Sequence, residues 1–317
     1  MQFNPKTLIG ALGSVEWVLS SRHTPKYAPV FIVGPPRSGT TVVYQAICHR
    51  LHVAYPSNLI VGCNLDRAPR LYRLCWLALR WLDHSSDSSF QSDCGETKGY
   101  GGPSEASMIW RRWFPNETQY TTDGYFNERQ IRQMRACVAN VEALFDGPFV
   151  NKNIKHSVRI RALCEIFPRA LFIEVHRDPV MNAQSIYLTR GSKPYRDRKW
   201  FSVKPREVDQ LLGLDALEQA VAQVFYVRRN IAEDRCRVGA RRFFTVPYEA
   251  FCADPRRWIR DIAAFMNEGG APTTPNGRLP ETFECSRKQR LDDVRFGRLQ
   301  QLVDQYFTPP PGETSDS

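Results

Sequence analysis

Three basic residues in this chain stand where apolar runs end, which is where side chains can gather around an anion. Arg37 lies in "GPPRSG" (34–39), directly after the apolar run Val30–Val33. Lys152 ends the run "GPFVNK", and Arg177 closely follows "ALFIEV". If these runs are parallel strands of one sheet, their carboxyl ends open into one crevice, where ligands bind in such folds. The spacing therefore predicts a site for an anionic ligand.

The loop 34–41 has the glycine spacing of a P-loop but lacks the lysine of that motif. The usual pattern is G-x-x-x-x-G-K-[ST], in which the lysine reaches the β- and γ-phosphates of a nucleotide. Gly34, Gly39 and Thr41 fit this pattern, but Thr40 occupies the lysine position and Arg37 is three residues early. Backbone N–H groups and the positive end of the following helix can still hold an anion. The loop therefore favours an anionic ligand other than a triphosphate with its magnesium ion.

The sequence shows no convincing metal site. A magnesium-dependent nucleotidase needs an aspartate after a second strand, and the best candidate, Asp178, directly precedes Pro179. Aspartate followed by proline is the signature of a helix N-cap. His49 and His52 have a metal-like spacing but no companion cysteine or acid. We therefore predict that no metal ion is bound.

Two motifs together resemble the sulfotransferases that use 3′-phosphoadenosine 5′-phosphosulfate (PAPS). "PPRSGTT" (35–41) is similar to the loop that holds the 5′-phosphosulfate in that family. "RDPVMNAQS" supplies an arginine and, eight residues later, a serine, the pair that holds the 3′-phosphate. The resemblance implies PAPS as co-substrate, with 3′-phosphoadenosine 5′-phosphate (PAP) as product. The residues expected to bind it are Pro36, Arg37, Ser38, Gly39, Thr40, Thr41, Arg177 and Ser185.

The resemblance is closer to the bacterial and Golgi carbohydrate-type members than to the cytosolic ones. Val42 stands where cytosolic members carry the tryptophan that stacks on the adenine. Their K-x-H pattern is also missing, because Asn153 and Ile154 follow Lys152. The run "NKN" (151–153) is instead similar to the lysine-bearing strand end of Golgi-type and bacterial members.

Sulfuryl transfer requires groups that stabilise charge on the leaving phosphate and a base for the acceptor hydroxyl. Arg37, Lys152 and the loop amides are expected to stabilise the charge. Glu105 in "GYGGPSEASMIWRRWFP" (99–115) is the first candidate for the base, by similarity to Golgi-type relatives. The alternative is that Glu105 sits in the first turn of a helix capped by Ser104 and only favours its dipole. His156 is the second candidate, with a structural donor as its alternative.

Apolar runs alternate with helical patterns along most of the chain, which predicts an α/β fold. We expect a three-layer structure with a mostly parallel central sheet flanked by helices, as the resemblance to the P-loop NTPase-like sulfotransferase fold also implies. One domain is expected over 1–308, with an insertion at about 56–123 that shapes the acceptor pocket and a disordered tail at 309–317. Strands are expected at 30–33, 147–152, 170–175 and 242–249, and helices at 40–51, 126–145, 156–166, 206–235 (broken near Gly213) and 254–265.

The composition narrows the range of partners. Lys and Arg outnumber Asp and Glu by 43 to 33, which suits anionic ligands. The charges form no stripe and no nucleic-acid-binding signature is present, so we expect no nucleic acid partner. Nine scattered cysteines without a C-x-x-C pair favour reduced thiols and a cytoplasmic location. No run reaches the ~20 apolar residues of a transmembrane helix, although the arginine-flanked run 71–82 allows a buried helix, a lid or peripheral membrane contact.

The expected function is metal-independent, in-line transfer of a sulfuryl group from PAPS to a hydroxyl-bearing acceptor, a glycan or a glycolipid-like molecule. The alternative is a P-loop small-molecule kinase that uses ATP and magnesium, against which Thr40 and the Arg177/Ser185 pair argue. A third hypothesis, a noncatalytic nucleotide-sensing or nucleic-acid-binding protein, is supported only by the basic charge balance.

Overall fold

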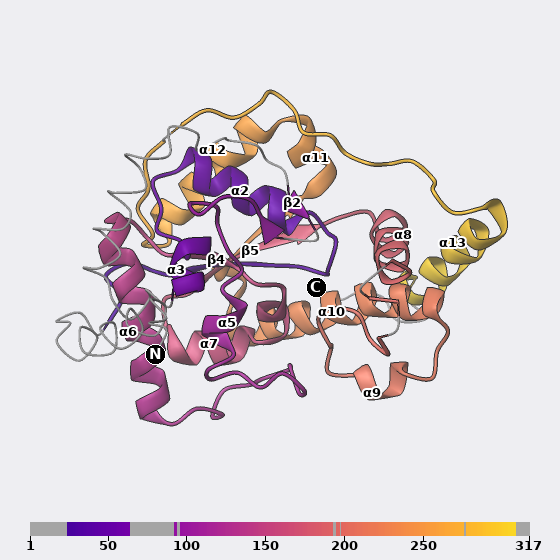
Figure 1. The fold of residues 1–317 in the computed structure, drawn as a ribbon, viewed down its shortest axis with the longest axis horizontal. Coiled ribbons are helices and arrows are strands. Elements are labelled where there is room, and N and C mark those ends of the chain that lie inside the picture. Colours follow the sequence, from indigo (N-terminus) through magenta and orange to yellow (C-terminus); the bar gives the residue numbers. More distant parts are fainter. Residues whose placement is uncertain are drawn as a thin grey trace, which may run out of the picture.

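The protein is built on a parallel sheet, as the alternating sequence pattern predicts. The computed structural model describes residues 24–63, 92–93, 96–192, 195–196, 198–275 and 277–308. Four parallel strands lie in the order β4-β1-β5-β6, with helices on both faces (Figure 1). The strands are β1 (Val30–Val33), β4 (Val150–Lys152), β5 (Leu171–His176) and β6 (Phe243–Pro247). The α/β fold class is confirmed.

Helices connect the strands and cover the sheet. The long ones begin at residues whose side chains accept hydrogen bonds from first-turn N–H groups, such as Asn127, Asp215 and Asp254. The other elements are α2 (Thr40–Arg50), α3 (Asn58–Cys63), β2 (Ser92–Asp93), β3 (Glu96–Thr97), α5 (Ser107–Trp110), α6 (Glu128–Phe145), the 3-10 turn η2 (Ile154–Val158), α7 (Ile160–Ile166), α8 (Pro179–Arg190), α9 (Val208–Leu211), α10 (Ala216–Val238), the 3-10 turn η3 (Ala240–Arg242), α11 (Tyr248–Ala253), α12 (Pro255–Glu268) and α13 (Asp293–Phe307).

The central strand β1 shows how the sheet separates two apolar cores. All four of its side chains are buried, and successive residues of a strand point to opposite faces. Val30 and Ile32 pack in a cluster with side chains of α2, α11 and α12, whereas Phe31 and Val33 pack with α6, α7 and α10. Figure 1 shows α2, α11 and α12 on one side of the sheet and α7 and α10 on the other. A strand buried on both faces explains the continuous apolar run of the sequence.

A third apolar cluster fixes α8, the helix that follows β5. Ala183 and Ile186 of α8 pack against Leu217 and Val221 of α10 and against Leu299 of α13. The Asp178 carboxylate accepts a hydrogen bond from the Met181 N–H at 2.9 Å, and Pro179 occupies the first helical position. The prediction that Asp178 is a helix cap is confirmed.

Several predicted boundaries differ from those observed. The last strand ends at Pro247 instead of residue 249, because proline has no N–H for the ladder and Tyr248 already begins α11. The segment expected as a helix from residue 156 starts as the 3-10 turn η2. The predicted break near Gly213 is confirmed, since it separates α9 from α10. The run 71–82 and the tail 309–317 lie outside the described residues, and the single-domain arrangement stays a prediction.

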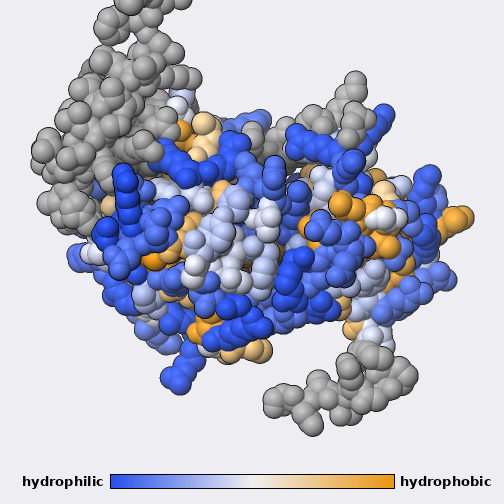
Figure 2. Space-filling model, turned by 90° about the horizontal axis from the view of Figure 1, so that it is seen from below, coloured by the Kyte–Doolittle hydropathy of each residue, from blue (hydrophilic) through white to orange (hydrophobic). Residues whose placement is uncertain are grey.

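The surface seen from below in Figure 2 is mostly hydrophilic, and hydrophobic side chains gather there only in separate patches. Of the helices in the described part of the chain, none is long and apolar enough to cross a bilayer. Among the cysteines whose side chains are described, Cys48, Cys164, Cys236, Cys252 and Cys285 are free thiols.

Candidate active site at the sheet mouth

The loop between β1 and α2 is held in place by contacts that only glycine permits. A Cβ on Gly34 would lie 2.7 Å from the Val175 carbonyl oxygen. Gly39 has φ 94°, and a Cβ there would lie 2.1 Å from Cδ2 of Tyr248. Ser157 secures the start of the loop, because its Oγ accepts from the Gly34 N–H at 2.9 Å and donates to the Gly34 carbonyl at 2.8 Å. The backbone is therefore shaped before any ligand binds.

The loop presents donors for which the described part of the chain supplies no acceptor. Helix α2 begins at Thr40 without a side-chain cap, so its first-turn N–H groups point toward the loop opening. The Ser38 side chain is fully buried, and its hydroxyl has no hydrogen-bond partner among the described residues. A buried hydroxyl without a partner costs free energy. This arrangement fits an anion bound at the helix N-terminus.

Arg177 joins the loop to the end of β5. Its Nη1 donates to the Arg37 carbonyl at 3.0 Å and its Nη2 to the Ser286 carbonyl at 2.9 Å. Its Nε is buried and has no partner in the described part of the chain. The Arg37 Nε in turn donates to Ser185 Oγ at 3.3 Å. The structure thus brings together the three residues that the two sequence motifs singled out.

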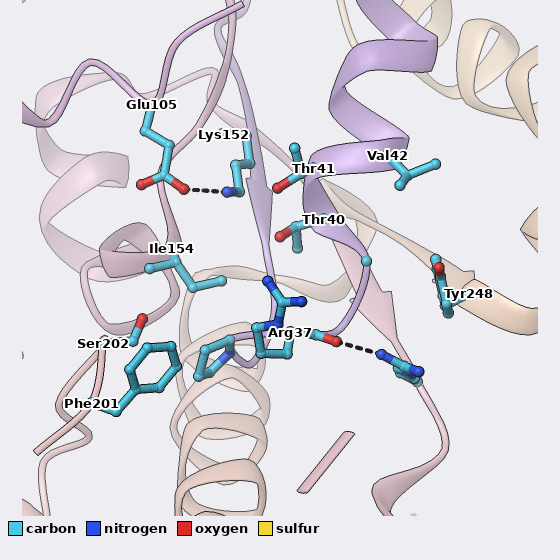
Figure 3. Close-up of a pocket in the computed structure, with 13 residues that line it drawn as sticks. Arg37, Thr40, Thr41, Val42, Glu105, Lys152, Ile154, Phe201, Ser202 and Tyr248 are labelled. Atoms are coloured by element: carbon cyan, nitrogen blue, oxygen red, sulfur yellow. Dashed lines mark hydrogen bonds and ion pairs between the residues drawn. The ribbon is translucent and has the colours of Figure 1, made fainter. Parts of the chain in front are cut away.

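Lys152 and Glu105 form an ion pair on the other side of the loop (Figure 3). The Lys152 side chain is buried at the end of β4, while that of Glu105 is 27% exposed. Asn151 and Asn153, which flank Lys152, donate through Nδ2 to the carbonyls of Ser104 (3.2 Å) and Glu105 (3.0 Å). The "NKN" run therefore positions the carboxylate as well as supplying the lysine.

The expectation that Glu105 lies in the first turn of a helix is wrong. Helix α5 starts only at Ser107, and Ala106 before it has φ 54°. Ser104 Oγ does accept a hydrogen bond, but from the Ala106 N–H at 3.2 Å, in a turn that precedes the helix. The backbone carbonyls of this segment are instead held by Asn151 and Asn153. Glu105 therefore lies before the helix and does not occupy its first turn, as the alternative role required.

His156 packs against Phe31 of β1 and is not among the residues that line the cavity described below. It is fully buried, and its ring makes edge contacts with those of Phe31 and Trp110. Its Nε2 is 3.1 Å from Asn151 Oδ1. Burial, together with the nearby Arg159 cation, lowers the pKa of His156 well below its usual value. His156 is thus a neutral ring that packs beneath the strand carrying Lys152.

One cavity is lined by the four charged residues of the site, Arg37, Glu105, Lys152 and Arg177. Figure 3 shows Glu105, Ile154, Phe201 and Ser202 on one side of Arg37, and Val42 and Tyr248 on the other. The cavity is lined by Pro36, Arg37, Gly39, Thr40, Thr41, Val42, Glu105, Lys152, Ile154, Arg177, Phe201, Ser202 and Tyr248. Ser185 and Ser38 are absent from this lining, although Ser185 contacts Arg37. No cluster of three or more potential metal-ligating His, Cys, Asp or Glu occurs among the described residues.

Several lining residues were not anticipated as site residues from the sequence, among them Ile154, Phe201, Ser202 and Tyr248. Tyr248 follows β6, so the strand-end rule that found Arg37 and Arg177 would also have found it. Phe201 and Ser202 reach the cavity from a segment between α8 and α9 that has no strand before it. The backbone of Ser202 has a φ of 65°, which residues other than glycine rarely adopt. No local sequence signal marks that conformation.

The chain belongs to the sulfotransferase family, whose profile matches residues 29–269. It is 29% identical over 118 residues to the omega-hydroxy-beta-dihydromenaquinone-9 sulfotransferase Stf3 of Mycobacterium bovis and to that of Mycobacterium tuberculosis. The match covers 37% of this chain and 28% of each relative, so it spans less than a third of their length.

Similar folds occur among solved bacterial sulfotransferases. The structure of sulfotransferase STF1 from Mycobacterium tuberculosis superposes with a TM-score of 0.56 at 13% identity, over 96% of this chain and 83% of that one. Sulfotransferase STF9 from Mycobacterium avium matches over 95% of this chain and 73% of that one, with a TM-score of 0.48 and 18% identity. At this level of identity the likeness to STF1 concerns the fold alone.

Proposed function

We propose that this protein transfers a sulfuryl group from PAPS to a hydroxyl group of an acceptor. The observation that carries the proposal is a pair of buried donors, Ser38 Oγ and Arg177 Nε, which have no partner among the described residues and lie at two points of one site. A nucleotide with an anionic group at each end satisfies both, whereas a triphosphate chain extends from one end only. Family membership and the fold support the same reaction.

The two ends of the nucleotide are assigned to different groups. The 5′-phosphosulfate binds at the loop, to the first N–H groups of α2, the Ser38 hydroxyl and the Arg37 guanidinium. The 3′-phosphate binds at Arg177 Nε and Ser185, which the contact between Arg37 and Ser185 brings beside the loop. Tyr248 and Val42 line the cavity on the side away from Glu105 (Figure 3). We assign the adenosine to that side.

The reaction needs one base and one cation besides the loop. The acceptor oxygen attacks sulfur, its proton passes to the Glu105 carboxylate, and the bond from sulfur to the bridging oxygen breaks. Negative charge then develops on the 5′-phosphate of PAP, where Lys152 and Arg37 stabilise it. The ion pair with Lys152 holds the Glu105 carboxylate at the cavity. His156 has no part in this scheme, because its ring is fully buried among Phe31, Trp110 and Phe114.

The acceptor binds on the Glu105 side of the cavity. Ile154 and Phe201 provide apolar surface there, and Ser202 adds a polar group. A glycan or a glycolipid-like molecule suits this mixed lining. The mycobacterial relative is named for a hydroxylated menaquinone, which extends the candidate acceptors to other lipids that carry a terminal hydroxyl.

The reaction is tested by incubating the protein and sulfur-labelled PAPS with lipid and polar extracts, in the presence of a metal chelator. We expect label to enter a product with the wild-type protein and not with Lys152→Met. A parallel incubation with phosphate-labelled ATP and magnesium serves as the control for the kinase alternative. Transfer from ATP, with none from PAPS, would overturn the proposal.

A further inference from the structure

A second group of cations includes two lysines that lie within two residues of the cavity lining in the sequence. Lys155, Arg159 and Lys204 come from two distant parts of the chain, and all three contact the segment 115–119. Lys155 Nζ donates to Asn116 Oδ1 at 3.1 Å, Arg159 Nη2 to the Pro115 carbonyl at 3.2 Å, and Lys204 Nζ to the Glu117 carbonyl at 3.5 Å. We call these three residues the outer cation cluster.

The three cations of this cluster contact neutral groups in the described part of the chain. Its three members donate to neutral oxygens, and within the described residues none of them forms an ion pair with a carboxylate. Arg159 is almost fully buried, with its guanidinium 4.3 Å from the centre of the Phe114 ring. Burial lowers the pKa of Arg159 to about 9. Burying or crowding cations without counter-ions costs free energy of folding. We therefore expect the cluster to bind an anion.

The pKa of Lys155 reflects its burial and the other cations close to it. Its pKa is lowered by burial and by the nearby Arg159 and Arg111 cations. The Glu105 carboxylate acts in the opposite direction and raises the pKa of Lys155.

The cluster adjoins the cavity through the residues next to it in sequence. Lys155 follows Ile154, and Lys204 comes two residues after Ser202, and both of these neighbours line the cavity on the Glu105 side (Figure 3). The Lys204 N–H donates to Gln119 Oε1 at 3.0 Å, which ties the segment around Ser202 to residues 115–119. A molecule whose hydroxyl reaches Glu105 would thus extend past Ile154 and Ser202 toward Lys155 and Lys204.

We propose that the acceptor carries an anionic group in addition to its hydroxyl, and that Lys155 and Lys204 bind this group. This inference rests on the proposed function, because it names a property of the acceptor of that reaction. A phosphate, sulfate or carboxylate replaces the neutral oxygens that the two lysines now contact. Hydrogen bonds between charged partners are stronger than those to neutral ones. The buried Arg159 adds a fixed positive field beneath them.

The test measures binding to the protein saturated with PAP, so that the nucleotide phosphate sites are occupied. The probes are 6-hydroxyhexyl phosphate, 6-hydroxyhexanoate and hexane-1,6-diol, which share a chain with a terminal hydroxyl and differ in charge. By calorimetry we expect the phosphate to bind at least about tenfold more tightly than the diol. The combined Lys155→Met and Lys204→Met variant should lose this preference. Lys26→Met, which removes an exposed lysine ahead of β1, should retain it.

Equal binding of the phosphate and the diol, or a preference that survives in the double variant, would overturn the inference. Unchanged PAP affinity of the double variant shows that its site is intact, and the proposed function then stands or falls separately. If the double variant does not fold, the salt dependence of the wild-type protein replaces it. The preference for the phosphate should fall as ionic strength rises, and a preference insensitive to salt is the contrary result.

Binding of 6-hydroxyhexanoate as tight as that of the phosphate would identify a general anion site, and weaker binding a phosphate-selective one.

Discussion

Glu105 and Lys152 meet because β4 ends beside the segment that leads into α5. If Glu105 is the base, replacing its carboxylate by an amide removes proton acceptance while keeping the size of the side chain. We expect Glu105→Gln to lower kcat by roughly a hundredfold or more, the usual contribution of a general base. Steady-state assays with labelled PAPS measure this, and calorimetry should show PAP affinity within about threefold of wild type. A Glu105→Gln enzyme with full turnover would remove Glu105 from the mechanism.

Substitution of His156 should affect stability more than turnover. The ring packs among Phe31, Trp110 and Phe114, so its loss leaves a cavity beneath β4. We expect His156→Ala to lower the free energy of unfolding by about 2–4 kcal/mol, as for other large buried side chains. Turnover of the fraction that remains folded should fall far less than in Glu105→Gln. Denaturation by urea and assays at low temperature separate the two effects. Abolished turnover at unchanged stability would assign the base to His156.

At the scale of single residues, the sequence was informative where a side chain follows a strand directly. Arg37, Lys152 and Arg177 could be expected at one crevice because parallel strands end on one edge of a sheet. The ion pair between Lys152 and Glu105 could not, because residues 47 positions apart meet only through tertiary packing. Ser202 was missed because its position depends on a left-handed backbone conformation without a glycine.

The loop between β1 and α2 acts as one element, and Gly39 is its most constrained position. With φ 94° and the Tyr248 ring in the space of a Cβ, alanine there must displace both the loop and the tyrosine. We expect Gly39→Ala to weaken PAP binding by more than about tenfold, because the loop amides lose their alignment. Calorimetry measures the affinity, and circular dichroism checks that the fold is retained.

Gly213 provides the matched control for this substitution. No atom lies within 4 Å of a Cβ built there, and it stands in the connection between α9 and α10. Gly213→Ala should bind PAP as the wild type does. Equal affinities of the Gly39 and Gly213 variants would contradict the assigned role of the loop.

The elements themselves were largely predictable, because buried strands and capped helices leave local signals. The four strands of the sheet, the cap at Asp178 and the break near Gly213 follow from apolar runs, from an aspartate before proline and from a glycine. The start of α5 was not predictable, since a serine in a polar run is compatible with a cap at several positions. There the hydrogen bonds from Asn151 and Asn153 decide the conformation, and they come from another part of the chain.

At the scale of the whole molecule, buried carboxyl groups make the free energy of unfolding depend on pH. Glu142 of α6 accepts a hydrogen bond from the Lys26 N–H at 2.7 Å, and burial raises its pKa from 4.5 to about 7. The folded state therefore retains a proton that the unfolded chain releases above about pH 4.5. This stabilisation is complete below that pH and is lost as the pH rises through about 7. It amounts to at most about 3 kcal/mol.

We expect Glu142→Gln, which stays uncharged, to lose less stability than the wild type between pH 5 and 8. Urea denaturation at each pH gives the two curves, and their difference isolates the contribution of Glu142. Asp234, whose pKa burial raises to about 6, contributes in the same direction in both proteins and cancels in the difference. Parallel curves for the two proteins would show that Glu142 does not titrate in this range.

The most direct test of the proposed nucleotide site is a calorimetric titration of the protein with PAP in the presence of a chelator. Matched titrations with adenosine 5′-phosphate, and with ATP and magnesium, provide the comparison. We expect PAP to bind at least about tenfold more tightly than adenosine 5′-phosphate, and Arg177→Ala to remove most of that difference, because Arg177 holds the 3′-phosphate. Tight binding of ATP with magnesium, together with no preference for PAP, would contradict the proposed function.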